Sequence, residues 1–264
     1  MSVFKGNIEN WTRLSEPDYY ILFVKAWLPF NAWYVAEMPQ HNKIDKLLIR
    51  ELQDNNSRPK LKIISLLNGN DYESIEFKYN LAFLHENLEK RSLMHNGKLL
   101  SFKKITLTRN PTKHKNDSDK EGNKYKAEVR NKNFEALIVD KGNKTILSIK
   151  KSNYDINDLT SDINYTALKL SMQRKMRACY EAINPHKPVN LITRSRKREE
   201  GILLHKDLGI RFVNDQDSIA RAVIKVLYAL RCMLFHGEVD PTRNNMKIYQ
   251  HAFYLLKEIV KELK

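Results

Sequence analysis

The sequence predicts an α+β protein that is mainly helical and carries a small antiparallel β-sheet inserted between two helical parts. Apolar side chains recur every three or four residues in 1–95 and in 156–264, which is the period of a helix. In 96–155 the period changes to two, which is typical of strands. With 264 residues, of which 42% are hydrophobic and 29% charged, the chain is long enough to bury a sizeable core.

Residues 1–95 are expected to supply the first helices of a bundle. Ser15 and Asp18, with Pro17 between them, form a helix-start signal, because a hydroxyl caps free amides and proline is tolerated in the first turn. Pro29 should kink or divide this helix. An aromatic stripe at helical spacing predicts core packing rather than base stacking, and it comprises Tyr20, Phe23, Trp27, Phe30 and Tyr34. Further helices are expected at 45–53 and 72–94.

Residues 96–155 are expected to form three or four antiparallel strands. Ile, Leu, Val, Thr and Phe are frequent in 99–108, 127–140 and 145–149, and Lys141-Gly142-Asn143 suits a hairpin turn. The segment 110–124 is polar throughout, and we expect it to be a mobile loop.

Residues 156–264 are expected to complete the bundle with helices at 162–183, 217–236 and 241–263. Asn184-Pro185 ends the first of these helices, and Gly237 is well placed to terminate the second. Asp240 is the expected cap of the last helix, with Pro241 at its first position. Residues 185–200, between the helices at 162–183 and 217–236, are expected to form a basic loop.

The charge distribution indicates a polyanionic partner. The chain has 46 basic and 31 acidic residues, a net charge of +15, yet residues 1–95 hold 12 of each. The excess therefore falls on 96–155, with 15 basic and 7 acidic residues, and on 156–264, with 19 and 12. The basic loop has two possible interpretations, a contact surface for an RNA backbone and a solvated linker. Its basic residues are Arg194, Arg196, Lys197 and Arg198.

Several function classes lack their sequence signatures. There is no glycine-rich phosphate loop, His-Glu-x-x-His, Cys-x-x-Cys or Gly-x-Ser-x-Gly motif, so we expect neither a bound metal nor a cofactor. The acidic residues are dispersed, but carboxylates can converge in space, so a metal-dependent nuclease stays open. Cys179 and Cys232 are too few for a disulfide framework. No secretion signal or membrane span is evident, which makes the cytoplasm the expected location and a membrane an unexpected partner.

The segment Val226 to Pro241, "VLYALRCMLFHGEVDP", carries the clearest motif. Arg231 and His236 sit at the end of an apolar helix with four residues between them. Two other Arg-His pairs have similar spacing but do not lie on one apolar helix, namely Arg109 with His114 and Arg198 with His205. Arg91 and His95 end another helix but are one residue too close.

This segment resembles the HEPN superfamily of helical bundles, whose ribonuclease members carry Arg-x(4 to 6)-His at this place. The "LFHG" ending and Asp240-Pro241 also match. The resemblance implies an HEPN-like bundle and a metal-independent endoribonuclease that acts as a homodimer through its motif helices. Members often serve as toxins or antiphage effectors, so a neutralising or activating protein partner is implied as well. Cys232 departs from the family, in which a polar residue usually follows the arginine.

The chemistry of the pair fits RNA cleavage by the 2′-hydroxyl. His236 can act as general acid or base, and the partial negative charge of the helix C-terminus should raise its pKa. Arg231 can hold two phosphate oxygens. Five residues along a helix place the two side chains about 140° apart, so a second copy is needed to focus both on one phosphate. Tyr228 and Lys225 on the same helix are further candidates for RNA contact, and for Tyr228 packing is an equal alternative.

Two other functions remain open on the sequence alone. One is a non-catalytic HEPN-type module for RNA binding or assembly, which the departure at Cys232 favours. The other is a basic accessory protein that binds DNA, which the net charge allows.

Overall fold

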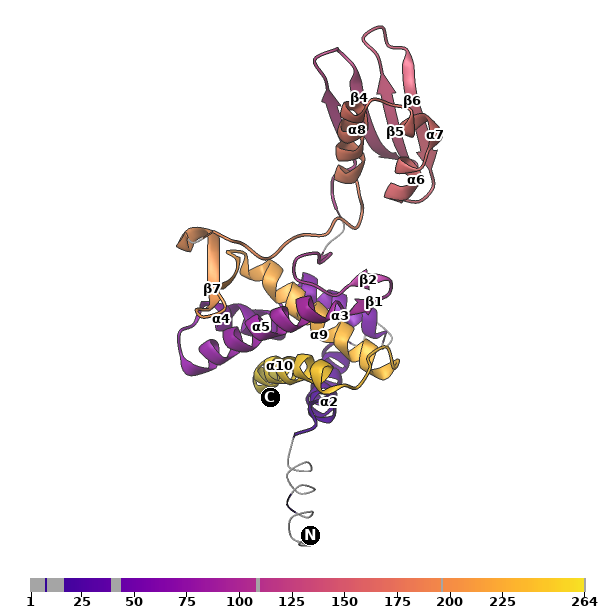
Figure 1. Cartoon of the computed structure of the whole chain (residues 1–264). Coiled ribbons are helices and arrows are strands. Elements are labelled where there is room, and N and C mark those ends of the chain that lie inside the picture. Colours follow the sequence, from indigo (N-terminus) through magenta and orange to yellow (C-terminus); the bar gives the residue numbers. More distant parts are fainter. Residues whose placement is uncertain (1–7, 9–16, 39–43, 108–109, 196, 264) are drawn as a thin grey trace. The chain divides into compact units, whose positions relative to one another are not determined.

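The computed structural model describes residues 8, 17–38, 44–107, 110–195 and 197–263, and its chain forms two compact units (Figure 1). One unit consists of Met1–Leu107 and Val189–Lys264, and the other of Thr108–Pro188. Within the described ranges there are nine α-helices and antiparallel sheets of two, four and two strands, so the predicted α+β class is confirmed. No helix in these ranges is long and apolar enough to cross a membrane.

The first unit, which we call the helical unit, contains six α-helices in its described part. Helix α10 packs against α2 and α5, while α9 packs against α3 and α4 (Figure 1). The helices are α2 (Tyr19–Glu37), α3 (Asp45–Asp54), α4 (Arg58–Asn68), α5 (Tyr72–Arg91), α9 (Gln216–Phe235) and α10 (Arg243–Val260). Helix α4 was not predicted from the sequence.

Helix α2 carries the aromatic stripe into the core. Asp18 caps the helix by accepting hydrogen bonds from the backbone amides of Tyr20 and Ile21, whereas Ser15 lies outside the described residues. Pro29 lies inside one undivided helix. The predicted core packing of the stripe is confirmed, since its four buried members are Phe23, Trp27, Phe30 and Tyr34.

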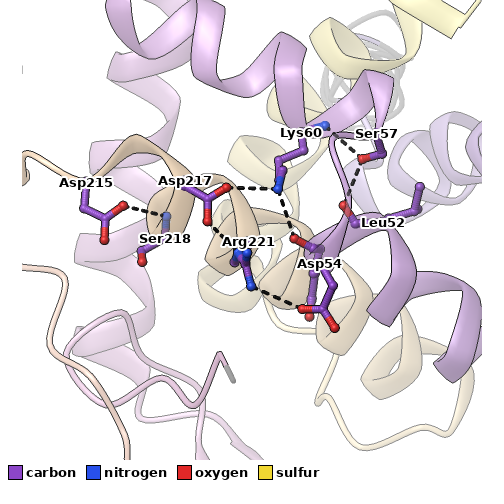
Figure 2. A network of polar contacts seen from close by, with 9 residues as sticks. Leu52, Asp54, Ser57, Lys60, Asp215, Asp217, Ser218 and Arg221 are labelled. Atoms are coloured by element: carbon purple, nitrogen blue, oxygen red, sulfur yellow. Dashed lines mark hydrogen bonds and ion pairs between the residues drawn. The ribbon is translucent and has the colours of Figure 1, made fainter. Parts of the chain in front are cut away.

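A buried lysine joins α4 to the start of α9 (Figure 2). The Lys60 side chain is 2% exposed, and its ammonium lies 2.9 Å from a carboxylate oxygen of Asp217 and donates to the Gln53 carbonyl at 3.4 Å. Arg221 pairs with the other oxygen of Asp217 at 2.6 Å and with Asp54 at 3.2 Å. The network therefore ties α3, α4 and α9 together.

Two histidines are buried in the helical unit and are neutral. His251 Nδ1 lies 2.9 Å from the amide oxygen of Asn80, which can only accept, so this nitrogen donates. Burial lowers the pKa of both His251 and His85 to about 4.

Short strands complete this unit. β1 (Met94–His95) pairs with β2 (Lys98–Leu99), and β7 (Gly201–His205) pairs with β8 (Ile210–Val213) and packs on α5. The remaining turns of helix are η2 (Arg198–Glu200) and η3 (Lys261–Leu263). The basic loop is thus partly structured, and its end leads directly into an unpredicted hairpin.

The second unit, which we call the sheet unit, is a four-stranded antiparallel sheet packed against helix. The strands run in the order β3 (His114–Ser118), β4 (Lys124–Arg130), β5 (Asn133–Val139) and β6 (Thr145–Lys151). The helices are α6 (Ile156–Thr160), α7 (Ile163–Thr166) and α8 (Leu170–Ala182). α8 packs on one face of the sheet, where Tyr125, Ile138 and Met176 are buried in one core.

Several expected elements differ from the structure. The segment 110–124, expected to be a loop, contains β3, whose residues are all exposed and are held by backbone pairing with β4. The segment 127–140, expected to be one strand, turns at Asn131 and Lys132, which both have positive φ. Of residues 99–107, the described part of 99–108, only Leu99 lies in a strand. The hairpin turn at Lys141-Gly142-Asn143 is confirmed, with Asn143 at φ 63°.

The division of the chain also differs from the expected parts 1–95, 96–155 and 156–264. The helical segment at 162–183 splits into α7 and α8, and it belongs to the sheet unit because its apolar side chains cover the sheet. The inserted unit is therefore Thr108–Pro188, and the bundle resumes only at Val189.

Candidate active site

Helix α9 ends at the predicted place and in a defined geometry. Gly237 has φ 67°, a left-handed conformation that glycine adopts without a Cβ penalty. Its amide donates to the Leu234 carbonyl at 3.3 Å, and the Glu238 amide donates to the Met233 carbonyl at 2.9 Å. This pair of bonds is a Schellman motif, and it fixes His236 as the C-cap residue.

The predicted cap of the next helix is wrong. Thr242, and not Asp240, precedes α10, and its hydroxyl accepts from the Asn245 amide at 3.2 Å. Pro241 therefore lies in the turn before the helix.

Arg231 is held on two sides at the end of α9. A terminal nitrogen of its guanidinium lies 3.2 Å from the Asp45 carboxylate, and the guanidinium carbon lies 4.8 Å from the centre of the Phe235 ring. The side chain is 24% exposed, and its Nε is buried without a hydrogen-bond partner in the described structure. Arg231 is thus oriented but still reachable from solvent.

The carboxylate that pairs with Arg231 is itself positioned by α2. The Tyr34 hydroxyl lies 3.2 Å from an oxygen of Asp45, and the Asn31 amide nitrogen lies 2.5 Å from the Tyr34 hydroxyl. Burial raises the pKa of Tyr34 well above its usual range, and the nearby charge of Asp45 adds to this effect. The phenol therefore stays protonated and donates to Asp45.

His236, the C-cap residue of α9, is exposed. Its backbone amide donates to the Cys232 carbonyl at 2.9 Å, while its imidazole has no hydrogen bond or ion pair to any described residue. The neighbouring Phe235 is 53% exposed. The ring nitrogens of His236 are therefore available to a ligand.

A second imidazole lies close to this helix end. His95 Nδ1, on β1, is 2.8 Å from a carboxylate oxygen of Glu238, two residues after His236. The Asn96 amide nitrogen lies 2.9 Å from His95 Nε2, and because the amide donates, Nδ1 carries the proton that bonds Glu238. The contact between His95 and Glu238 fixes the β1–β2 hairpin beside the C-terminus of α9.

Tyr228 and Cys232 lie in the packing behind the motif. Tyr228 is half-buried, with its ring 6.3 Å from that of Trp27, and burial followed by a hydrogen bond with Cys232 raises its pKa to about 12. Cys232 is a buried free cysteine. The structure thus packs Tyr228 against α2 and buries Cys232 inside the helical unit, and the expected RNA contact of Tyr228 stays a prediction.

Lys225 contacts a distant segment of the helical unit. Its ammonium hydrogen-bonds to the backbone carbonyl of Thr106, and burial lowers its pKa. Lys225 thus holds the segment that follows β2, and its expected contact with RNA stays a prediction.

The cations of the basic loop are only partly described. Arg194 is exposed, and Lys197 pairs with Glu200 at 3.0 Å. Arg196 and the side chain of Arg198 lie outside the described residues. The structure does not bring Arg194 or Lys197 into contact with Arg231 or His236.

The sheet unit has a group of cations that sequence reasoning did not single out. Strand register places them at the end of the sheet where β4 turns into β5, and each is exposed without a carboxylate within 4.0 Å in the described part of the unit. By contrast, Lys126 and Lys150 on the open face pair with Glu128 and Glu135. We call this group the basic rim, and it consists of Lys113, Arg130, Lys132 and Lys151.

Comparison of the chain with protein-family models, curated proteins and solved structures found no match. In the described ranges, no three His, Cys, Asp or Glu side chains are grouped in a way that could hold a metal ion. The candidate site therefore rests on its own geometry.

Sequence reasoning found Arg231 and His236 but missed the groups that position them. Asp45 and His95 contact the end of α9 from segments far away in the chain, and a single sequence carries no signal for such pairs. Asp45 had one local signal, since an acidic residue in the first turn of a helix is favoured by the helix dipole.

Proposed function

We propose that this protein is a metal-independent endoribonuclease of HEPN type that acts as a homodimer in the cytoplasm. Arg231 stabilises the charged phosphate in the transition state, and His236 transfers a proton to or from the reacting oxygens. The observation that carries this proposal is the presence of both side chains at the solvent-accessible end of one helix.

The geometry of Arg231 supports a phosphate-binding role. Its guanidinium is already oriented by Asp45 and by the ring of Phe235, so little side-chain entropy is lost when it binds an anion. A phosphate that approaches replaces part of the interaction with Asp45. Charge-assisted hydrogen bonds to a developing oxyanion contribute about 3 kcal/mol in comparable sites.

A second copy of the chain completes the site in this proposal. Arg231 and His236 project about 140° apart on a helix, so one copy cannot direct both at the same phosphate. Three exposed apolar side chains belong to the same part of the helical unit. Phe235, at 53% exposure, contacts Arg231, and Ile44, at 52%, and Leu47, at 41%, lie close to Asp45 in the sequence. Burying them supports association through the ends of α3 and α9.

The sheet unit supports RNA as the substrate class. Its basic rim offers four unpaired cations, which suit contacts to the sugar-phosphate backbone independent of sequence. A role as a toxin or antiphage effector, with a protein partner that restrains the enzyme, follows from the family resemblance alone.

The test is cleavage of a labelled single-stranded RNA in EDTA by the full chain. We expect cleavage by the wild type and loss of at least a hundredfold in Arg231→Ala and in His236→Ala. His114→Ala and Arg174→Ala remove the same types of side chain from exposed positions of the sheet unit, and they should cleave at the wild-type rate.

The second candidate is a non-catalytic module for RNA binding. It is favoured by Cys232, which is buried and cannot act as the polar residue expected after the arginine. RNA affinity without cleavage, equal in the wild type and in His236→Ala, would support this candidate. A preference for duplex DNA over RNA would support a DNA-binding accessory protein.

A further inference from the structure

A pocket of about 640 Å³ with a mixed polar and apolar lining lies at the opposite end of α9 from the motif. It is lined by residues from α4 and α5, from the β7–β8 hairpin and from the first turn of α9, all within the helical unit. Its volume is typical of sites for small molecules, which run from about 300 to 1,000 Å³. Arg231 follows Gln216, a lining residue, by 15 positions, which is about 22 Å along the helix. The pocket is therefore separate from the candidate active site.

The pocket contains a cation without a counter-ion. Arg211, on β8, lines it and is partly buried, and no carboxylate of a described residue lies within 4.0 Å of its guanidinium. Lys78 is a second lining cation, and its ammonium donates to the Gly69 carbonyl at 2.6 Å. Glu199 is the acidic residue in the lining. With Arg211 and Lys78, the net charge of the lining is therefore +1. A planar guanidinium of this kind binds phosphate through two parallel hydrogen bonds.

The wall beside Arg211 is a chain of amides that hold one another. Gln216 Nε2 donates to the side-chain oxygens of Asn68, at 3.2 Å, and of Asn214, at 3.1 Å. The Asn214 amide nitrogen in turn donates to the Glu199 carbonyl at 3.1 Å. These bonds leave the Gln216 oxygen as an acceptor and the Asn68 amide nitrogen as a donor, neither bonded to a described residue. A fixed donor and acceptor side by side can read the edge of a nucleobase.

We propose that this pocket binds a nucleotide, with Arg211 on the phosphate and the amides of Asn68 and Gln216 on the base. Ile202 and Leu203, which are partly exposed, supply apolar lining surface against which the flat base can lie. The ligand is either a free nucleoside monophosphate or the terminal nucleotide of an RNA, because both present the same chemistry. This site goes beyond the proposed ribonuclease function and does not depend on it.

The test is calorimetric titration of the full chain, in the His236→Ala background so that RNA is not consumed. The probes are the four ribonucleoside 5′-monophosphates and an RNA trinucleotide with and without a 5′-phosphate. We expect saturable binding at one site per chain for at least one phosphorylated probe. Tighter binding of the monophosphate indicates a free nucleotide, and tighter binding of the trinucleotide indicates an RNA end.

Arg211→Gln should weaken this binding at least tenfold. Asn68→Asp should also weaken it, because it replaces the amide that donates to the base with a carboxylate that can only accept. Lys206→Gln is the matched control, since it removes a positive charge from the exposed turn of the same hairpin outside the lining. It should bind as the wild type does. The proposal is overturned if no probe saturates the protein, or if Arg211→Gln and Lys206→Gln bind equally well. RNA cleavage is measured separately, on the protein with intact His236. Failure of the nucleotide-binding proposal therefore does not imply failure of the ribonuclease proposal, or the reverse.

Discussion

Arg231 has both a structural role, in its contacts within the helical unit, and a proposed chemical role, in binding phosphate. Its ion pair with Asp45 and its contact with Phe235 fix the plane of the guanidinium at the end of α9. A lysine at this position keeps the positive charge but has neither the planar fork nor the stacking surface. The two properties can therefore be separated by one substitution.

We predict that Arg231→Lys folds normally and cleaves RNA about a hundredfold more slowly than the wild type. Steady-state cleavage rates and thermal unfolding, measured on the same preparation, check this prediction. Cleavage at the wild-type rate would show that charge alone is enough at this position.

The start of α9 depends on an ion-pair network rather than on apolar packing alone. Lys60 is buried, while Asp217 is about half exposed and also pairs with Arg221 (Figure 2). Burial opposes ionisation of Asp217, but the hydrogen bonds from Lys60 and Arg221 outweigh it, so its pKa is lowered. The stabilisation from this carboxylate is present above the ordinary pKa of an aspartate and is lost as the pH falls through the lowered value.

We predict that Asp217→Asn destabilises the protein by about 3 kcal/mol, because it leaves the buried ammonium of Lys60 unpaired. Lys60→Met replaces the same side chain with an apolar one and should change the free energy of unfolding by less than about 1 kcal/mol. Urea unfolding of both variants provides the measurement. The opposite order of stabilities would contradict this explanation of the network.

The basic rim is the second element whose contribution can be measured alone. We predict that changing all four of its residues to glutamine lowers the slope of log affinity against log salt by about 3 for single-stranded RNA. Filter binding at several salt concentrations measures this slope. Lys126→Gln with Lys150→Gln, which removes two lysines already paired on the open face of the sheet, should change the slope much less. Equal changes in the two sets would exclude the rim as a distinct contact surface.

At the scale of the whole molecule, the buried histidines make stability depend on pH. An unfolded histidine binds a proton near pH 6.5, whereas His85 and His251 do so only near pH 4, because burial disfavours their charged form. Between these values the unfolded chain holds more protons than the folded one. Stability therefore falls as the pH drops from about 6.5 towards 4.

We predict that the double variant His85→Gln with His251→Gln has a flatter pH dependence in this window than the wild type has. The free energy of unfolding, measured with urea at several pH values, gives the slope. The comparison uses the slope and not the absolute stability, since glutamine at either buried site lowers stability at every pH. An unchanged slope would mean that other groups titrate in this window.

The sequence predicted the parts of the fold that depend on local pattern. Helices α2, α9 and α10 were found from their apolar period, and the end of α9 from Gly237. Strand β3 was missed because it is polar and exposed, and only its pairing with β4 makes it a strand. α8 was assigned to the bundle because an amphipathic helix does not reveal which core it covers.

The candidate site also has a part that the sequence predicts and a part that depends on the tertiary fold. Arg231 and His236 lie in one short motif and could be found from sequence, whereas Asp45 and His95 come into contact with that motif only through the tertiary fold. The bond of Lys225 to the Thr106 carbonyl could not be predicted for the same reason, since it depends on the path of a distant segment.

The chemical ends of the RNA fragments test the proposed mechanism most directly. Cleavage by the 2′-hydroxyl, assisted by His236 and Arg231, must leave a 2′,3′-cyclic phosphate on one fragment and a 5′-hydroxyl on the other. We predict these ends for RNA cut by the purified protein in EDTA, and no such fragments from His236→Ala. Fragments with a 3′-hydroxyl and a 5′-phosphate, or cyclic-phosphate ends that persist in His236→Ala, would contradict the mechanism.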